Sequence, residues 1–165
     1  MRKLSLSVLI LAAALTASPA LAHPGHEAAS FASGIAHPFS GLDHMLAMIA
    51  VGLWAAQRGG SALWAWPTAF VAAMLAGYGL GVLVPGAPLI EPLIMASVVV
   101  LGVATAADRR VPVAAGLALI AAFGLAHGYA HGSEAPAGGL QAAFPLGFAL
   151  ATVALHLSGL AAGAG

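Results

Sequence analysis

The strongest constraint in this sequence is a series of apolar stretches, each close in length to a membrane-spanning helix. An α-helix needs about 20 residues to cross roughly 30 Å of hydrocarbon. Hydrophobic residues make up 61% of the 165-residue chain and charged residues only 6%, whereas roughly a quarter of a soluble domain is charged. The sequence therefore predicts an all-α integral membrane protein, a bundle of about five transmembrane helices with short loops. The expected helices are 38–57, 62–84, 89–107, 111–131 and 139–163.

The first 22 residues are predicted to be a cleaved signal peptide. Arg2 and Lys3 precede a short apolar run that ends in the small-residue pattern Ala20-Leu21-Ala22, as in secretory signals. An uncleaved first helix is the alternative. Residues 23–165 are then expected to form a single transmembrane helical domain.

The basic residues beyond residue 22 predict how the helices are oriented. They are Arg58, Arg109 and Arg110, and they fall in two of the breaks between apolar stretches. The positive-inside rule places those breaks in the cytoplasm, so the mature N-terminus and the turn at 132–138 are expected outside. The mature chain has a net charge of −2 and offers no basic surface for nucleic acid. The expected partner is the lipid bilayer, and a homo-oligomer is left open.

Three groups able to bind a metal ion or a proton begin the first stretch, HPFSGLDHMLAM. On one continuous helix His37 and His44 would lie within about 20° of the same face, beside Asp43. Gly41 between them is expected to loosen the first turn. An ionised carboxylate in a membrane costs at least about 2.5 kcal/mol unless it is paired, and no Lys or Arg is near. A bound cation or a proton is therefore the expected partner of Asp43.

A second group lies in AHGYAHGSEAP, at the same expected depth. His127, His131 and Glu134 have the spacing i, i+4, i+7, which places them on one face of a helix, as when a helix offers two imidazoles to one metal. The alternative is that each histidine is a hydrogen-bonded packing residue. Without cysteine, a metal would be held by imidazole, carboxylate, thioether or backbone oxygen.

Four other residues are weaker candidates for metal ligands. His23 and His26 lie near the predicted mature N-terminus, Glu91 begins the third stretch, and His156 lies deep in the fifth. The alternative for His23 and His26 is that they belong to a flexible tail. The alternative for Glu91 is an interfacial acid. His156 is either part of a route to the cytoplasm or a lone packing residue. The methionines of the first stretch, Met45 and Met48, are interpreted as packing side chains.

These patterns resemble the HupE/UreJ family of nickel and cobalt permeases. HPFSGLDHMLAMIAVGLWA is similar to the first-helix signature, GLAHGYAHGSEAP to the second, and EPLIMASVVVLG to the middle segment, so the resemblance covers most of residues 23–160. It implies a permease that imports Ni²⁺ or Co²⁺ across the inner (cell) membrane of a bacterium, with no prosthetic group and no enzymatic activity. A further C-terminal hydrophobic helix is common in the family, whereas this sequence stops at LSGLAAGAG. The metal-handling residues that the resemblance implies are His37, Asp43, His44, His127, His131 and Glu134.

Two other classes of protein use the same residue types. A membrane-embedded metal-dependent hydrolase would activate a water with these groups, helped by Ser40 or Ser133, and a b-type haem protein would use histidine pairs as axial ligands. Acids beside each histidine pair favour a cation over haem. The sequence contains no HExxH, no nucleophile elbow and no GxxxxGK[ST] loop, the signatures of zinc hydrolases, serine hydrolases and P-loop ATPases.

Overall fold

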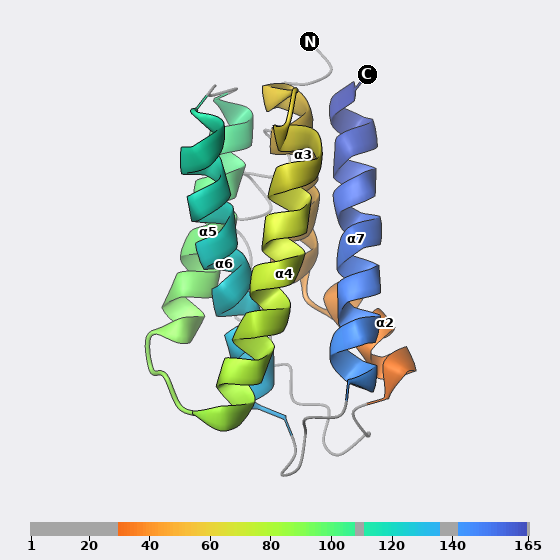
Figure 1. The fold of residues 1–165 in the computed structure, drawn as a ribbon, viewed down its shortest axis with the longest axis vertical. Coiled ribbons are helices and arrows are strands. Elements are labelled where there is room, and N and C mark those ends of the chain that lie inside the picture. Colours follow the sequence, from red (N-terminus) through yellow and green to blue (C-terminus); the bar gives the residue numbers. More distant parts are fainter. Residues whose placement is uncertain (1–29, 108–110, 136–141, 165) are drawn as a thin grey trace.

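The computed structural model describes residues 30–107, 111–135 and 142–164, which form six α-helices with short connections and no strand within those ranges. Helices α3 to α7 stand side by side, and α2 lies against the lower end of α7 (Figure 1). The prediction of an all-helical protein is confirmed for this part of the chain. The helices are α2 (Phe31–Ser40), α3 (Leu42–Arg58), α4 (Ala62–Leu83), α5 (Ile90–Ala106), α6 (Val113–Ser133) and α7 (Ala143–Ala164).

Fewer helices are long enough to cross a membrane than the sequence predicts. Among the described residues α4, α6 and α7 pass by length and composition, and α2 with α3 passes as a bent pair. Helix α5 is apolar but has only 17 residues, fewer than the roughly 20 that span hydrocarbon. The expected five full spans are therefore corrected to three, or four with the bent pair, and a short apolar helix.

The first apolar stretch is two helices, so the prediction of one continuous helix from residue 38 is wrong. Helix α2 begins at Phe31 because Ser30 caps it, exchanging hydrogen bonds with Ser33 in a capping box. Pro38 therefore lies inside α2. Gly41 has an extended backbone (φ −114°, ψ 121°), and the chain bends by 88° there.

Helices α4 and α6 pack backbone against backbone. A Cβ atom at Gly77 of α4 would collide with the carbonyl oxygen of Leu125, and one at Gly128 of α6 with that of Met74. Small residues permit this approach, which matters in a bilayer because lipid supplies no hydrophobic drive for helix association. The close contact fixes the position of the α6 histidines relative to α4.

The interior of the bundle carries polar side chains, and the outside is apolar. Asp43, Ser97, Thr105, His127, His131, Thr152 and His156 are buried, whereas many leucines of α4 and α7 are exposed. This is the distribution of a membrane protein, in which lipid surrounds apolar side chains and polar groups face the interior.

Several predictions concern residues outside the described ranges. They are the signal peptide at 1–22, His23, His26, Arg109 and Arg110.

Candidate functional site

Four imidazoles and one carboxylate from three helices gather inside the bundle. His37 comes from α2, Asp43 and His44 from α3, and His127 and His131 from α6. We call these five residues the imidazole cluster. Its ring centroids are separated by 6.0 Å (His37 to His44), 4.4 Å (His37 to His131), 5.0 Å (His44 to His127) and 4.8 Å (His44 to His131).

Asp43 orients the ring of His44. The Oδ1 atom of Asp43 lies 3.1 Å from Nδ1 of His44 and accepts the backbone N–H of the same residue at 2.9 Å. A carboxylate can only accept hydrogen bonds, so this contact places the ring proton on Nδ1. The Nε2 atom of His44 is then a lone-pair donor, the tautomer that metal-bound histidines adopt when a carboxylate holds the other nitrogen.

His127 has the same tautomer for a different reason. Its Nδ1 lies 2.9 Å from the carbonyl oxygen of Phe123, one turn back on α6, and a carbonyl can only accept. Its Nε2 therefore carries a lone pair, and this buried atom has no hydrogen-bond partner. His127 and His44 thus both present an unprotonated Nε2.

His131 joins the cluster through a direct contact between imidazoles. Its Nε2 lies 2.8 Å from Nε2 of His44. Because the latter atom is the acceptor, His131 donates in this pair. The hydrogen bond links α6 to α3 at the level of the cluster.

The bend at Gly41 brings His37 to the cluster. The sequence argument placed His37 and His44 on one face of a single helix, and that reason is wrong because the helix is interrupted between them. The rings meet because α2 turns back and packs against α7. Gly41 also allows the carboxylate to come close, since a Cβ there would lie 2.7 Å from Oδ1 of Asp43 and 3.3 Å from Nδ1 of His44.

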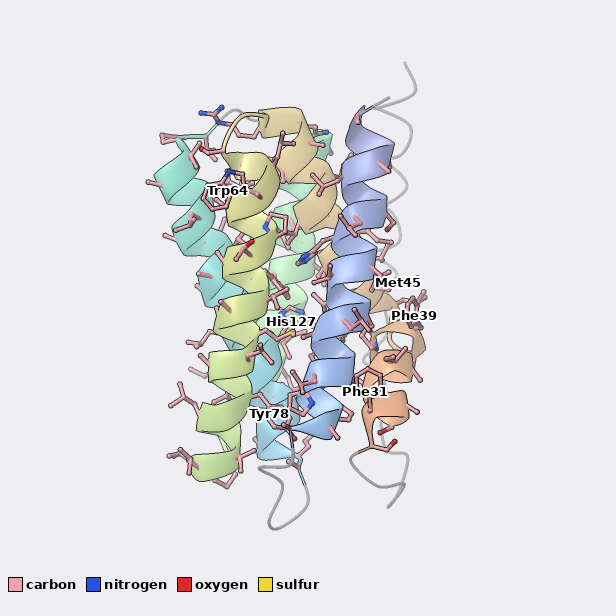
Figure 2. The ribbon with its side chains drawn as sticks, turned by 45° about the vertical axis from the view of Figure 1, so that its right-hand side comes forward. Phe31, Phe39, Met45, Trp64, Tyr78 and His127 are labelled. Carbon is pink, nitrogen blue, oxygen red and sulfur yellow. The ribbon has the colours of Figure 1, made fainter. Side chains whose placement is uncertain are left out.

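Burial increases along the cluster from the end of the bundle inward. His37 and His44 are half-buried, whereas Asp43 and His131 are buried and His127 is fully enclosed. Figure 2 shows His127 inside the bundle, between the levels of Trp64 and Tyr78. The rings of His37 and His131 make T-shaped contacts with the ring of Phe148 on α7. The cluster is therefore partly exposed at His37 and His44 and closed off by the fold at His127.

The imidazoles pack against one another and do not surround an ion position. Within the described ranges, no group of three or more His, Cys, Asp or Glu side chains could hold a metal ion as it stands. Two imidazole nitrogens that bind one ion, each at roughly 2.0–2.1 Å, lie about 3 Å apart or more. Metal binding here would replace the 2.8 Å hydrogen bond between His131 and His44 and turn their rings slightly.

Comparison with known proteins identifies the family. The family described as "HupE / UreJ protein" matches residues 11–165. The chain belongs to the HupE/UreJ family. Protein HupE of Rhizobium leguminosarum bv. viciae is 41% identical over 150 residues, which are 91% of this chain and 78% of that protein. No solved structure matches the chain.

Membership in the HupE/UreJ family agrees with the helices described above. The family is associated with nickel and cobalt transport, and its members are transporter-type proteins. Together with helices that are long and apolar enough to span a bilayer, this makes the chain a multi-pass membrane protein.

The remaining candidate ligands of this HupE/UreJ protein are not among the five residues of the imidazole cluster. Helix α6 ends at Ser133, so Glu134 is the exposed C-cap residue and not part of the helical face that carries His127 and His131. Glu91 is exposed in the first turn of α5. His156 is buried in α7, where its ring contacts Phe70.

Apart from His156, the sequence analysis missed the side chains of α7 that continue inward from the cluster. Phe144, Phe148, Thr152 and His156 occupy one face of α7 at four-residue spacing. That spacing was a visible signal, but the residues opposite this face were not predictable without the packing of the helices. The hydroxyl of Thr152 contacts the sulfur atoms of Met48 and Met74, which come from α3 and α4.

Proposed function

We propose that this protein is a permease that imports Ni²⁺ or Co²⁺ across the bacterial inner membrane and captures the ion at the imidazole cluster. The observation that carries the proposal is the shared tautomer of His44 and His127. Each has Nδ1 held by an oxygen acceptor and an unprotonated Nε2. Imidazole nitrogen suits Ni²⁺, Co²⁺ and Zn²⁺, and family membership favours the first two.

Asp43 supplies the negative charge that a divalent ion needs in this setting. It is buried and bonded to His44, so it polarises that imidazole and makes it a better ligand. In the proposed capture step, the incoming ion replaces the hydrogen bond between His131 and His44, and His37 is close enough to join the ligand set. A site of imidazoles and one carboxylate, without thiolates, releases its ion more easily than a cysteine site, as a transporter requires.

The proposed direction of transport follows from the ends of the bundle. Figure 1 shows the α4–α5 turn and the end of α6 at one end of the bundle, and the connection from α3 to α4 at the other. His127 and His131 of the cluster lie in the last two turns of α6. Arg58 is the last residue of α3, and its Nε donates to the carbonyl oxygen of Val111. The positive-inside rule assigns the Arg58 end to the cytoplasm. The half-buried edge of the cluster then faces the outside and receives the ion.

The geometry favours transport over the two rival classes. Axial imidazoles of a haem lie on opposite faces of the porphyrin, whereas His131 and His44 are in direct contact and leave no space for a ring between them. The proposed hydrolase helpers are engaged elsewhere, because Ser40 donates to the carbonyl of His37 and Ser133 to that of Ala130.

The proposed function is tested by uptake of radiolabelled Ni²⁺ and Co²⁺ into cells with and without the chain, in competition with Zn²⁺ and Cu²⁺. We expect chain-dependent uptake of one or both ions that a moderate excess of Zn²⁺ does not abolish. Membrane-inserted protein without uptake above the background of empty cells would refute the proposal. A Soret band in the purified protein would support the haem alternative instead.

A further inference from the structure

His156 is a buried imidazole without a hydrogen-bond partner. Its side chain is 1% exposed, and neither Nδ1 nor Nε2 is hydrogen-bonded. A buried polar group without a partner costs free energy that the fold must offset elsewhere. Every histidine of the imidazole cluster lies against another imidazole, whereas the ring of His156 packs against the ring of Phe70. A polar partner is therefore missing at this position.

Two thioethers and a hydroxyl converge one helical turn away from His156. The hydroxyl oxygen of Thr152 lies 3.3 Å from the sulfur of Met48 and 3.7 Å from that of Met74. It also lies 2.9 Å from the carbonyl oxygen of Phe148. The hydroxyl has one proton for these three acceptors, so at any moment at least one sulfur atom has no hydrogen bond from it.

These side chains form two adjoining levels in the bundle interior. Thr152 and His156 are four residues apart on α7, so they lie on one face. Phe70 and Met74 are four residues apart on α4, and Phe70 contacts His156 at a ring-centroid distance of 5.2 Å. Met48 lies one turn from Gly52 on α3, where the backbones of Gly52 and His156 touch. Three helices thus contribute to the same stretch of the interior.

This stretch adjoins the imidazole cluster. The ring of Phe70 contacts both His127 of the cluster, at 5.6 Å, and His156, at 5.2 Å. Beyond it, Trp66 packs against Trp54 with ring centroids 4.7 Å apart.

We propose that Met48, Met74, Thr152 and His156, the deep group, form a second metal site that receives the ion from the imidazole cluster. The inference rests on the proposed function, because it assigns the next position of the same ion. The donor set is two thioether sulfurs, one hydroxyl oxygen and one imidazole nitrogen. A transition-metal ion supplies the partner that His156 lacks.

The chemistry of the deep group suits a transit position. It contains no carboxylate, so a divalent ion is held by neutral donors and leaves more readily than from a charged site. Thioether and imidazole donors favour transition metals, whereas Mg²⁺ and Ca²⁺ require oxygen ligands. The deep group therefore acts as a second filter that hard cations do not pass.

A matched pair of substitutions separates metal binding from packing. His156→Leu and His156→Met introduce side chains of similar size, and both lose the imidazole, but only methionine supplies a metal ligand. We expect uptake of radiolabelled Co²⁺, normalised to inserted protein, to fall about tenfold or more in His156→Leu, the usual scale for losing a metal contact, and to be substantially retained in His156→Met. Equal uptake by the two variants, whether high or low, would overturn the proposal.

Equilibrium binding tests the site without relying on transport. We expect the full chain in lipid nanodiscs to bind two Co²⁺ ions, and His44→Ala to retain one weaker site. Adding Met74→Leu or His156→Leu to His44→Ala should remove that site, whereas adding Met45→Leu should not. Persistence of the weaker site in both double variants would refute the deep group. If the unmodified chain shows no uptake but His156→Leu removes the weaker Co²⁺ site, the proposed function is refuted and the deep metal site is supported.

Discussion

The imidazole cluster and the deep group use buried polar side chains in opposite ways. In the cluster, histidines hold one another and a carboxylate by hydrogen bonds, as between His44 and both Asp43 and His131. In the deep group, His156 has no hydrogen bond, and its neighbours are thioethers and an aromatic ring. The cluster carries a negative charge and is half-open, whereas the deep group is neutral and closed.

This difference shows how one bundle can combine capture with release. A charged and partly exposed group of ligands attracts a divalent cation from water, because Asp43 compensates part of the charge of the cation. A neutral and drier position holds the same ion less strongly, since only dipoles and polarisable sulfur contact it. An ion that moves from the first position to the second is thus already released from its tightest contacts.

Gly128→Ala is expected to have the largest effect, because it disturbs both regions. Gly128 follows His127 directly, and its Cβ would collide with the carbonyl oxygen of Met74 in the deep group. Forcing α4 and α6 apart costs about 1–3 kcal/mol or more, so we expect less folded protein and little uptake. The measurements are the amount of monodisperse protein recovered after solubilisation in detergent and the uptake per cell.

The control for this substitution is Gly79→Ala, on the facing helix α4. A Cβ there meets nothing within 4 Å, and alanine is the better helix former. We expect normal amounts of protein and normal uptake. Equal behaviour of the two variants would contradict the close packing of α4 on α6.

Gly41→Ala should damage the imidazole cluster and spare the deep group. The added Cβ would lie 2.7 Å from Oδ1 of Asp43, so the carboxylate must move away from His44. We expect about tenfold lower uptake, the usual scale for losing the partner that orients a metal-binding histidine. Membrane insertion should be unchanged, and the weaker Co²⁺ site should persist. Wild-type uptake would show that the contact between Asp43 and His44 is dispensable.

External pH should affect capture at the cluster. A protonated imidazole cannot bind a metal. At fixed free Ni²⁺, we therefore expect initial uptake rates to decrease as external pH is lowered. A rate that rises steadily on acidification would indicate a proton-driven mechanism in place of downhill entry.

Cysteine labelling tests which region faces outward, and should leave uptake unchanged. The chain has no cysteine, so single substitutions report without background. Leu89→Cys in the exposed α4–α5 turn should react with an impermeant maleimide added outside, and Ser61→Cys between α3 and α4 should not. The opposite pattern would reverse the orientation and the proposed direction of transport.

The sequence was sufficient to predict the class of protein and much of the cluster. Apolar stretches of helical length predicted the bundle, because lipid leaves the backbone few alternatives to helix. The four-residue spacing of His127 and His131 placed both on one face, since α6 is regular there. Glu134, by contrast, lies beyond the end of α6, where helical spacing no longer says which way a side chain points.

The rest depended on tertiary contacts that spacing does not reveal. His37 reaches His44 through a bend at Gly41 and the packing of α2 on α7, not through a shared helical face. Met48 was interpreted as a packing residue because the sequence of α3 does not indicate that Thr152 of α7 lies against it. The Thr152 hydroxyl contacts residues of α3, α4 and α7 itself. The two methionines lie more than 70 residues before Thr152 in the chain.

The most direct test of the central claim is uptake of radiolabelled Ni²⁺ and Co²⁺ by Asp43→Asn, normalised to membrane-inserted protein. Asparagine keeps the size of the side chain and a carbonyl acceptor for His44, but it removes the charge. We predict that uptake is abolished while the amount of inserted protein is nearly unchanged. His44→Ala and His131→Ala should also lose uptake, whereas Met45→Leu should retain it. Normal Ni²⁺ and Co²⁺ uptake by Asp43→Asn would contradict the assignment of the imidazole cluster as the metal site.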